Sequence, residues 1–111
     1  MASIQQFYMS MLLSIVADSI SISPTTAYNK PTIAGSVTVN ITASGPWTLT
    51  VANGILSPSA TSGSGNGSIT VSWSSNGTKF CRYDSITFTC GTASALFDWT
   101  QIGTFQTDCV A

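Results

Sequence analysis

The chain has 111 residues and a formal net charge of −1 at pH 7, and charged side chains make up only 6% of it. This length predicts one domain with a single core, and three cations are too few to line a phosphate backbone, which excludes nucleic acid as a partner. A soluble domain usually has about a quarter of its surface charged. We therefore expect part of this Ser, Thr, Asn and Gly surface to lie against a partner, although hydroxyl-rich β-proteins also stay soluble with little charge.

Residues 1–17 form an apolar segment, which we expect to dock on a partner. Their apolar side chains follow the spacing of an amphipathic helix, but every second residue from Met9 to Ile15 is also apolar, so an extended arm is the alternative. No Lys or Arg precedes Lys30, so no secretory leader is expected, and the run is too short to span a membrane. The expected docking residues are Ile4, Phe7, Tyr8, Met11, Leu12 and Ile15.

Residues 18–111 alternate apolar and polar side chains, as strands with one buried face do. The first predicted strand runs from Ser19 to Pro24, and Pro24, Pro31 and Gly35 then frame a predicted loop. The inward residues of the later strands are Val37, Val39 and Ile41; Trp47, Leu49 and Val51; Ile69, Val71 and Trp73; and Ile86, Phe88 and Cys90. The segment from Leu96 to Phe105 offers Phe97 and Trp99 for a final strand. About seven short strands separated by turn signals predict an all-β fold, an immunoglobulin-like β-sandwich.

Three Asn-Gly pairs divide the middle of the chain, at Asn53-Gly54, Asn66-Gly67 and Asn76-Gly77. Each pair suits the positive φ angles of a tight hairpin turn, so each predicts a hairpin. The segment Leu56-Ser57-Pro58 indicates the end of a strand. The run from Thr61 to Gly67 indicates a long turn.

The order of these landmarks is informative. Trp47 is followed by Leu56-Ser57-Pro58, then by Ser-Gly-Ser-Gly-Asn-Gly at 62–67, then by Ile69-Thr70-Val71. This order resembles the BACON domain family, small immunoglobulin-like modules of gut bacteria and their phages. Arg82 and Ile86-Thr87-Phe88 lie where that family places its next strand, and the resemblance covers roughly residues 19–91. It implies residues 18–111 as one BACON-like β-sandwich domain, and the family name records a proposed carbohydrate role.

No residue set for catalysis emerges from the sequence. The chain has no His and no Glu, and its four Asp residues are dispersed. The chain therefore lacks the His that usually activates a serine or cysteine nucleophile. It also lacks a pair of acids at a defined spacing. We expect Asp84 near Arg82 to make a surface contact. The loop from Gly63 to Gly67 lacks the Lys-Ser/Thr of a phosphate-binding loop. The sequence predicts no enzyme, no catalytic residue and no cofactor.

The three cysteines, Cys81, Cys90 and Cys109, are odd in number. Cys81 and Cys90 are expected on one strand, where about 3.3 Å per residue puts them beyond disulfide reach. Cys90 with Cys109 is the one pair that we consider able to form. We favour reduced core cysteines, which indicate assembly in a reducing cytoplasm. Three scattered cysteines without His predict no metal site.

Exposed aromatic rings are the main candidates for a ligand site, because sugar-binding modules use rings as platforms for pyranoses. Trp47 and Trp73 share the phase of their apolar neighbours, which predicts that both are buried. The remaining candidate glycan contacts are Tyr28, Tyr83 and Trp99.

Together these features favour a non-enzymatic auxiliary or decoration protein of a phage capsid, assembled in the host cytoplasm and part of the virion. Its expected partner is the major capsid protein or another virion protein, with a homo-oligomer left open. The alternative is a secreted or cell-surface module that binds mucin or plant glycans. We expect no nucleic acid, no membrane and no metal among the partners.

Overall fold

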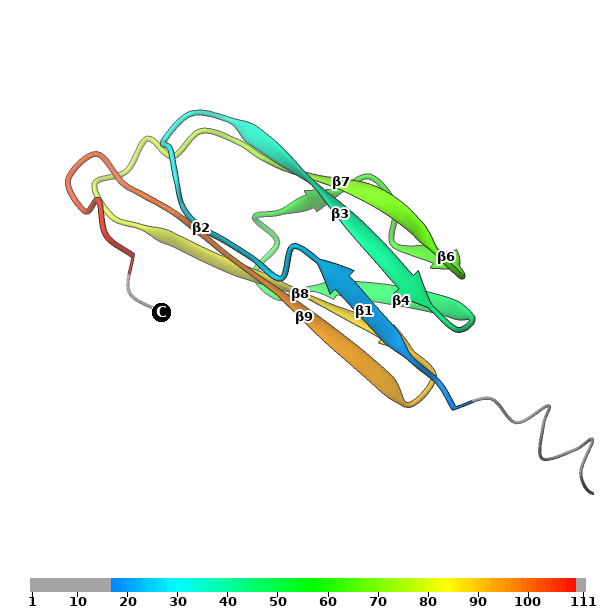
Figure 1. Ribbon diagram of the computed structural model, residues 1–111. Helices are drawn as coiled ribbons and strands as arrows, with labels where there is room; N and C mark the ends of the chain where they lie inside the picture. Colours follow the sequence, from blue (N-terminus) through cyan, green and yellow to red (C-terminus); the bar gives the residue numbers. More distant parts are fainter. Residues whose placement is uncertain (1–16, 110–111) are drawn as a thin grey trace, which may run out of the picture.

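The computed structural model describes residues 17–109, and within this range it has nine β-strands and no helix. The strands are β1 (Ile20–Ser23), β2 (Thr26–Lys30), β3 (Gly35–Ala43), β4 (Pro46–Val51), β5 (Ser57–Pro58), β6 (Ser62–Ser64), β7 (Gly67–Trp73), β8 (Arg82–Cys90) and β9 (Ala93–Gln101). They form a four-stranded sheet in the order β1-β3-β7-β5 and a five-stranded sheet in the order β2-β9-β8-β4-β6 (Figure 1). The predicted all-β class is confirmed, while the predicted docking residues of segment 1–17 lie outside the described residues.

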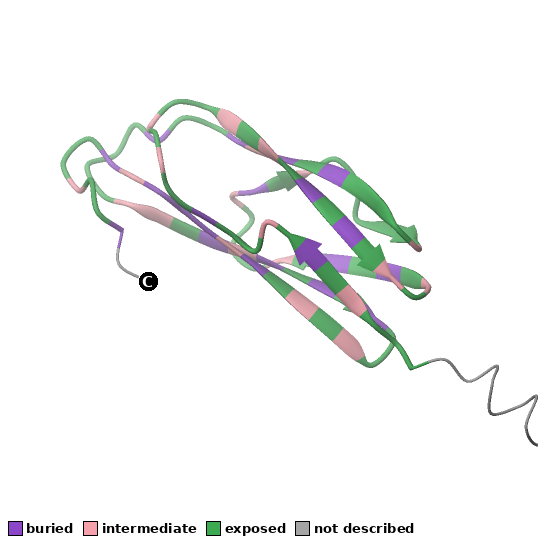
Figure 2. Ribbon diagram, viewed as in Figure 1, coloured by how far each residue is buried: buried purple, intermediate pink, exposed green. Residues whose placement is uncertain are grey.

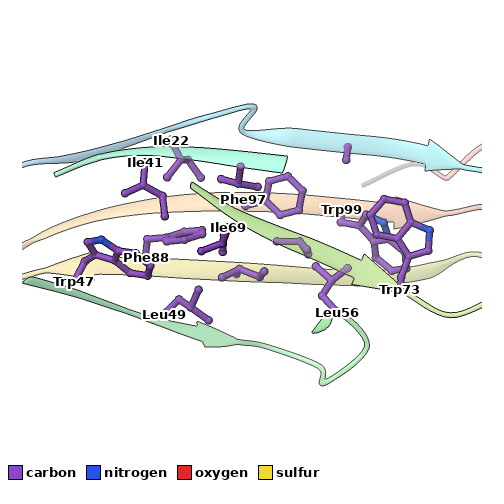
Figure 3. Packing of buried hydrophobic residues seen from close by; sticks show 14 of the residues in the cluster. Ile22, Ile41, Trp47, Leu49, Leu56, Ile69, Trp73, Phe88, Phe97 and Trp99 are labelled. Carbon is purple, nitrogen blue, oxygen red and sulfur yellow. The ribbon is translucent and has the colours of Figure 1, made fainter. Parts of the chain in front are cut away.

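One apolar core fills the space between the two sheets. Along the strands, buried residues alternate with exposed ones, as the period of two requires (Figure 2). Fifteen buried residues contributed by both sheets form the core cluster. Two aromatic pairs lie at opposite ends of it, Trp47 with Phe88 at 6.0 Å and Trp73 with Trp99 at 5.6 Å between ring centroids (Figure 3). The inward faces expected from the sequence are confirmed, with Val37 and Val51 only partly buried.

The chain changes sheet at every connection from β1 to β8, and only β8 and β9 form a hairpin between consecutive strands. The predicted hairpins at the three Asn-Gly pairs are therefore wrong, because each pair joins one sheet to the other. Of the glycines in those pairs only Gly54 has a positive φ, 74°. The β8–β9 hairpin turns instead at Gly91, with φ 59°, where a side chain would be strained.

Two strands lie where the sequence predicted a loop or a turn. β2 falls inside the predicted loop between Pro24 and Gly35, and it pairs in parallel with β9 at the sheet edge. β6 falls inside the predicted turn and pairs with β4, placing Gly63 opposite Trp47. A Cβ at Gly63 would lie 2.5 Å from Trp47 Cζ2. The missing side chain at Gly63 therefore lets the edge strand β6 approach the indole ring of Trp47. The glycine that suggested a turn is thus needed within a strand.

The disulfide joins Cys81 to Cys109, with their Cα atoms 5.8 Å apart. We expected reduced cysteines and considered only Cys90 with Cys109 able to pair, and both expectations are wrong, since Cys90 is the free, buried cysteine. The hairpin explains this, because Cys90 pairs with Ala93 beside the turn whereas Cys81 precedes the far end of β8. The chain after β9 continues from that far end, so Cys109 meets Cys81. The argument from reduced thiols to a reducing compartment no longer holds.

Candidate binding surfaces

Tyr28 and Tyr83 lie on the outer face of the five-stranded sheet, on the two strands that flank β9. Their side chains are 45% and 39% exposed, which confirms the exposure expected for both. Neighbouring strands are about 4.8 Å apart, so the backbones of β2 and β8 are separated by about 10 Å. Asp98 and Leu96 of β9 point to the same side, because Phe97 and Trp99 between them face the core. We call Tyr28, Tyr83, Leu96 and Asp98 the tyrosine face.

The polar centre of this face is a hydrogen bond in which the Tyr28 hydroxyl donates to Asp98 Oδ2 at 3.0 Å. This bond, with smaller effects from desolvation and from the carboxylate charge, raises the pKa of Tyr28 above its usual 10.0. The same hydrogen bond tethers the ring of Tyr28 to the sheet. Rows of exposed hydroxyls continue the face across β9, β8 and β4, and they come from Ser94, Thr87, Thr89, Thr48 and Thr50.

Trp99 does not belong to this face, and its predicted role as a glycan contact is wrong. It pairs with Asp84 in the β8–β9 ladder, in phase with the inward residues, and is 0% exposed. Its ring packs against Trp73 of the opposite sheet and lies 5.9 Å from the guanidinium carbon of Arg82. The burial predicted for Trp47 and Trp73 is confirmed.

Asp84 is buried, so the surface contact expected with Arg82 is wrong. Its Oδ1 accepts hydrogen bonds from the N–H groups of Asn53 and Ser85, both at 2.8 Å. Its Oδ2 accepts from the N–H groups of Ile55 at 2.8 Å and Leu56 at 2.9 Å. The carboxylate thus fixes the connection between β4 and β5. All four bonds go to backbone groups of the fold itself, so this carboxylate has a structural role.

Arg82 and Gln101 form a second polar cluster, at the end of the sandwich away from the β8–β9 turn. Arg82 Nε and Nη2 donate to Gln101 Oε1 at 3.0 and 2.6 Å, and Nη2 also donates to Ser74 O at 2.8 Å. Gln101 Nε2 donates to the carbonyl groups of Pro31 at 3.0 Å and Ile33 at 3.3 Å. These bonds join the β2–β3 and β7–β8 connections to the hairpin.

Asn76 completes the assembly of this end. Its N–H donates to Thr32 O at 2.7 Å, and its Nδ2 donates to Phe80 O at 2.8 Å and Ile102 O at 3.0 Å. Its Oδ1 accepts from both the N–H and the hydroxyl of Thr78. One buried amide therefore holds together three segments, residues 31–34, 74–81 and 102–109, which we call the loop end. The Asn76-Gly77 pair predicted a turn residue, and nothing in the sequence indicated this role.

Within residues 17–109, no three or more His, Cys, Asp or Glu side chains gather in a way that would hold a metal ion. The described part of the chain also has no helix with the length and apolarity needed to cross a bilayer.

No protein-family model matches the chain. No curated protein matches it either. Among solved structures, the fold is similar to part of a Bacteroides ovatus GH5 xyloglucanase in complex with a XXXG heptasaccharide, with a TM-score of 0.70 and 16% sequence identity. The match covers 76% of this chain but only 19% of that one, so this chain corresponds to about a fifth of the enzyme chain. At this identity the likeness shows a shared fold.

Proposed function

We propose that this chain is a non-enzymatic binding module, an immunoglobulin-like sandwich of the BACON type, whose tyrosine face binds glycans. The observation that carries the proposal is the placement of Tyr28 and Tyr83 on one exposed sheet face, two strands apart. The fold proposal is supported by the inward positions of the BACON-like landmarks Trp47, Leu56 and Ile69.

The tyrosine face has the chemistry that sugars require. Aromatic rings mounted on a sheet present apolar surface at little entropic cost, because the strands already fix their backbones. The carboxylate of Asp98 accepts hydrogen bonds from sugar hydroxyls, and the neighbouring threonine hydroxyls both donate and accept. A carboxylate at the centre repels acidic sugars. The face therefore fits a neutral glycan better than a sialylated or uronic one.

The likeness to a larger glycan-active enzyme adds support. That structure is a xyloglucanase with a bound heptasaccharide, and the part similar to this chain is 19% of its length. BACON-like modules accompany catalytic domains in exported enzymes, which suits a sandwich of this size. The disulfide between Cys81 and Cys109 is compatible with an oxidising, extracellular setting.

The test replaces both tyrosines, as Tyr28→Ala with Tyr83→Ala, and measures mobility in native gels that contain neutral plant glycans or mucin. We expect the wild-type protein to be retarded by at least one neutral polysaccharide. The double variant should bind about tenfold more weakly or worse, because both rings lose the apolar area that a sugar would bury, at about 25 cal/mol per Å².

The matched control replaces two exposed threonines on the outer face of the other sheet, as Thr38→Ala with Thr70→Ala, and should leave retardation unchanged. A wild-type protein that binds no glycan in the panel would remove the proposal. Equal retardation of the tyrosine variant would show that a different surface binds.

Capsid decoration is the second candidate, and one observation favours it. The outer face of the four-stranded sheet exposes only small neutral polar side chains, which can pack against a protein without desolvating a charge. They include Ser21, Ser23, Ser36, Thr38, Asn40, Thr42, Ser57, Ser68 and Thr70.

Deletion of residues 2–16 tests this second function, because the apolar segment is the expected anchor on the particle. We expect the deleted protein to fold and to lose its occupancy on purified virions, measured by quantitative gel analysis of sedimented particles. Occupancy equal to that of the full chain would exclude docking through this segment.

A further inference from the structure

The loop end exposes three large apolar side chains. Ile33, Phe80 and Phe105 are 69%, 65% and 80% exposed, more than any other large hydrophobic residue in the described part of the chain. The Phe105 N–H donates to Lys79 O at 3.1 Å, so the backbones beside the two phenylalanines are adjacent. Asn76 bonds to both Phe80 O and Thr32 O, which brings the segment of Ile33 to the same end.

The loop end lies far from the start of β1. Asp18 accepts a hydrogen bond from Thr92 N–H at 3.0 Å, beside the β8–β9 turn. Arg82, at the other end of β8, adjoins the loop end, and nine strand residues span about 27 Å. The three loops gather at the upper left of Figure 1, whereas β1 begins at the lower right. A ligand at the loop end therefore leaves the start of the sandwich unobstructed.

The loop backbones satisfy many of their hydrogen bonds internally. The carbonyl of Lys79 accepts from the N–H groups of Phe105 and Gln106, and the carbonyl of Thr78 accepts from that of Thr104. Gln106 Oε1 accepts from the N–H of Cys81 at 2.9 Å. A polar group that already has a partner loses little when water is removed, whereas an unpaired one costs several kilocalories per mole. These bonds lower the cost of removing water from this end.

The positive charges of the chain gather at the same end. Lys30 closes β2, Lys79 lies in the β7–β8 connection, and Arg82 opens β8, and these are all the Lys and Arg residues of the sequence. Asp108 is the one carboxylate in the segments of the loop end. Arg82 is bound to Gln101 and Ser74, whereas Lys79 is exposed and Lys30 is partly exposed.

We propose that the loop end docks on the surface of an anionic lipid bilayer. Phe80, Phe105 and Ile33 insert into the headgroup region, as the apolar residues of interfacial proteins do, and Lys30 and Lys79 meet the lipid phosphates. A protein partner fits less well, because lysine is depleted at protein interfaces, whereas Lys30 and Lys79 lie beside these apolar residues. The sequence led us to expect no membrane partner, and this proposal departs from that expectation, because surface insertion needs no spanning segment.

The test is sedimentation of the full chain with vesicles of phosphatidylglycerol and phosphatidylcholine, compared with phosphatidylcholine alone. We expect binding to the anionic vesicles that weakens with added salt. Phe80→Ser with Phe105→Ser should reduce it about tenfold or more, because both apolar side chains are lost. Lys79→Gln should reduce it about fivefold, the effect of one lysine near an anionic surface.

The control variant is Leu96→Ser, which removes an exposed apolar side chain from the tyrosine face and should bind vesicles like the wild type. With anionic vesicles present, a Phe80→Trp variant should show additional tryptophan fluorescence that is blue-shifted relative to the wild type. Brominated lipids should quench this added fluorescence. The proposal is overturned if the anionic vesicles do not sediment the protein, or if the Phe80/Phe105 variant binds them as well as the wild type. It is also overturned if brominated lipids do not quench the emission that the Phe80→Trp substitution adds.

Discussion

Replacing Trp99 with alanine is expected to lower the free energy of unfolding by about 3–5 kcal/mol, the range for removing a large buried aromatic side chain. Trp99 is fully buried, and its ring packs against Trp73 with 5.6 Å between centroids. The truncation therefore leaves a cavity between the sheets and also removes the ring beside Arg82. Urea unfolding with the disulfide intact measures the change.

Tyr83→Ala is the matched control for Trp99→Ala, because Tyr83 was also a candidate glycan contact but lies on the outer face. We expect its free energy of unfolding to stay within about 0.5 kcal/mol of the wild type. Similar small changes for both variants would mean that Trp99 is exposed and that the phase of β9 is reversed.

Replacing Asp84 with alanine is expected to destabilise the fold by about 3 kcal/mol or more. The carboxylate accepts three hydrogen bonds from the β4–β5 connection, and the one from Leu56 N–H is buried. Removing a charged acceptor strands these donors, each of which costs about 1–3 kcal/mol when buried. Thermal and urea unfolding report the loss, and amide exchange should rise first at residues 53–56.

Asp98→Asn is the control for Asp84→Ala, because Asp98 is a partly exposed carboxylate on the outer face of the same sheet. Its replacement should change stability by less than about 0.5 kcal/mol. If Asp84→Ala were equally mild, the connection between β4 and β5 would not depend on the carboxylate.

The strands with strict alternation could be predicted from the sequence. A strand that is buried on one face has apolar side chains at every second position, and this pattern is visible in the sequence. β3, β4, β7 and β8 all show it, with Val39, Trp47, Val71 and Phe88 inside. β2 could not be predicted in this way. Its sequence TAYNK has a single buried residue, Ala27, and its place depends on parallel pairing with β9, a contact distant in sequence.

The disulfide and the buried polar residues were missed for a related reason. Once β8 and β9 are paired as a hairpin, Cys90 lies at the turn and Cys81 at the opposite end, which selects Cys109 as the partner of Cys81. That step needs the register and not the spacing alone. Asp84 and Asn76 look like surface residues in the sequence, because only the three-dimensional path of the loops supplies their backbone partners.

The candidate site was predicted in part. Tyr28 and Tyr83 remained as candidates, with Trp99, once Trp47 and Trp73 were predicted to be buried, and both tyrosines are exposed on one face. Their common face could not be foreseen without β2, whose pairing with β9 brings Tyr28 next to Asp98. The loop end had no sequence signal of its own, because Ile33, Phe80 and Phe105 belong to three separate segments outside the strands.

The most direct test of the glycan-binding account is a titration of the isotope-labelled protein with a neutral oligosaccharide, followed by amide chemical-shift mapping. The account predicts that the shifts concentrate on β2, β8 and β9 around Tyr28, Tyr83 and Asp98, with the four-stranded sheet unaffected. Shifts confined to the four-stranded sheet, or no shift with any neutral oligosaccharide, would contradict it.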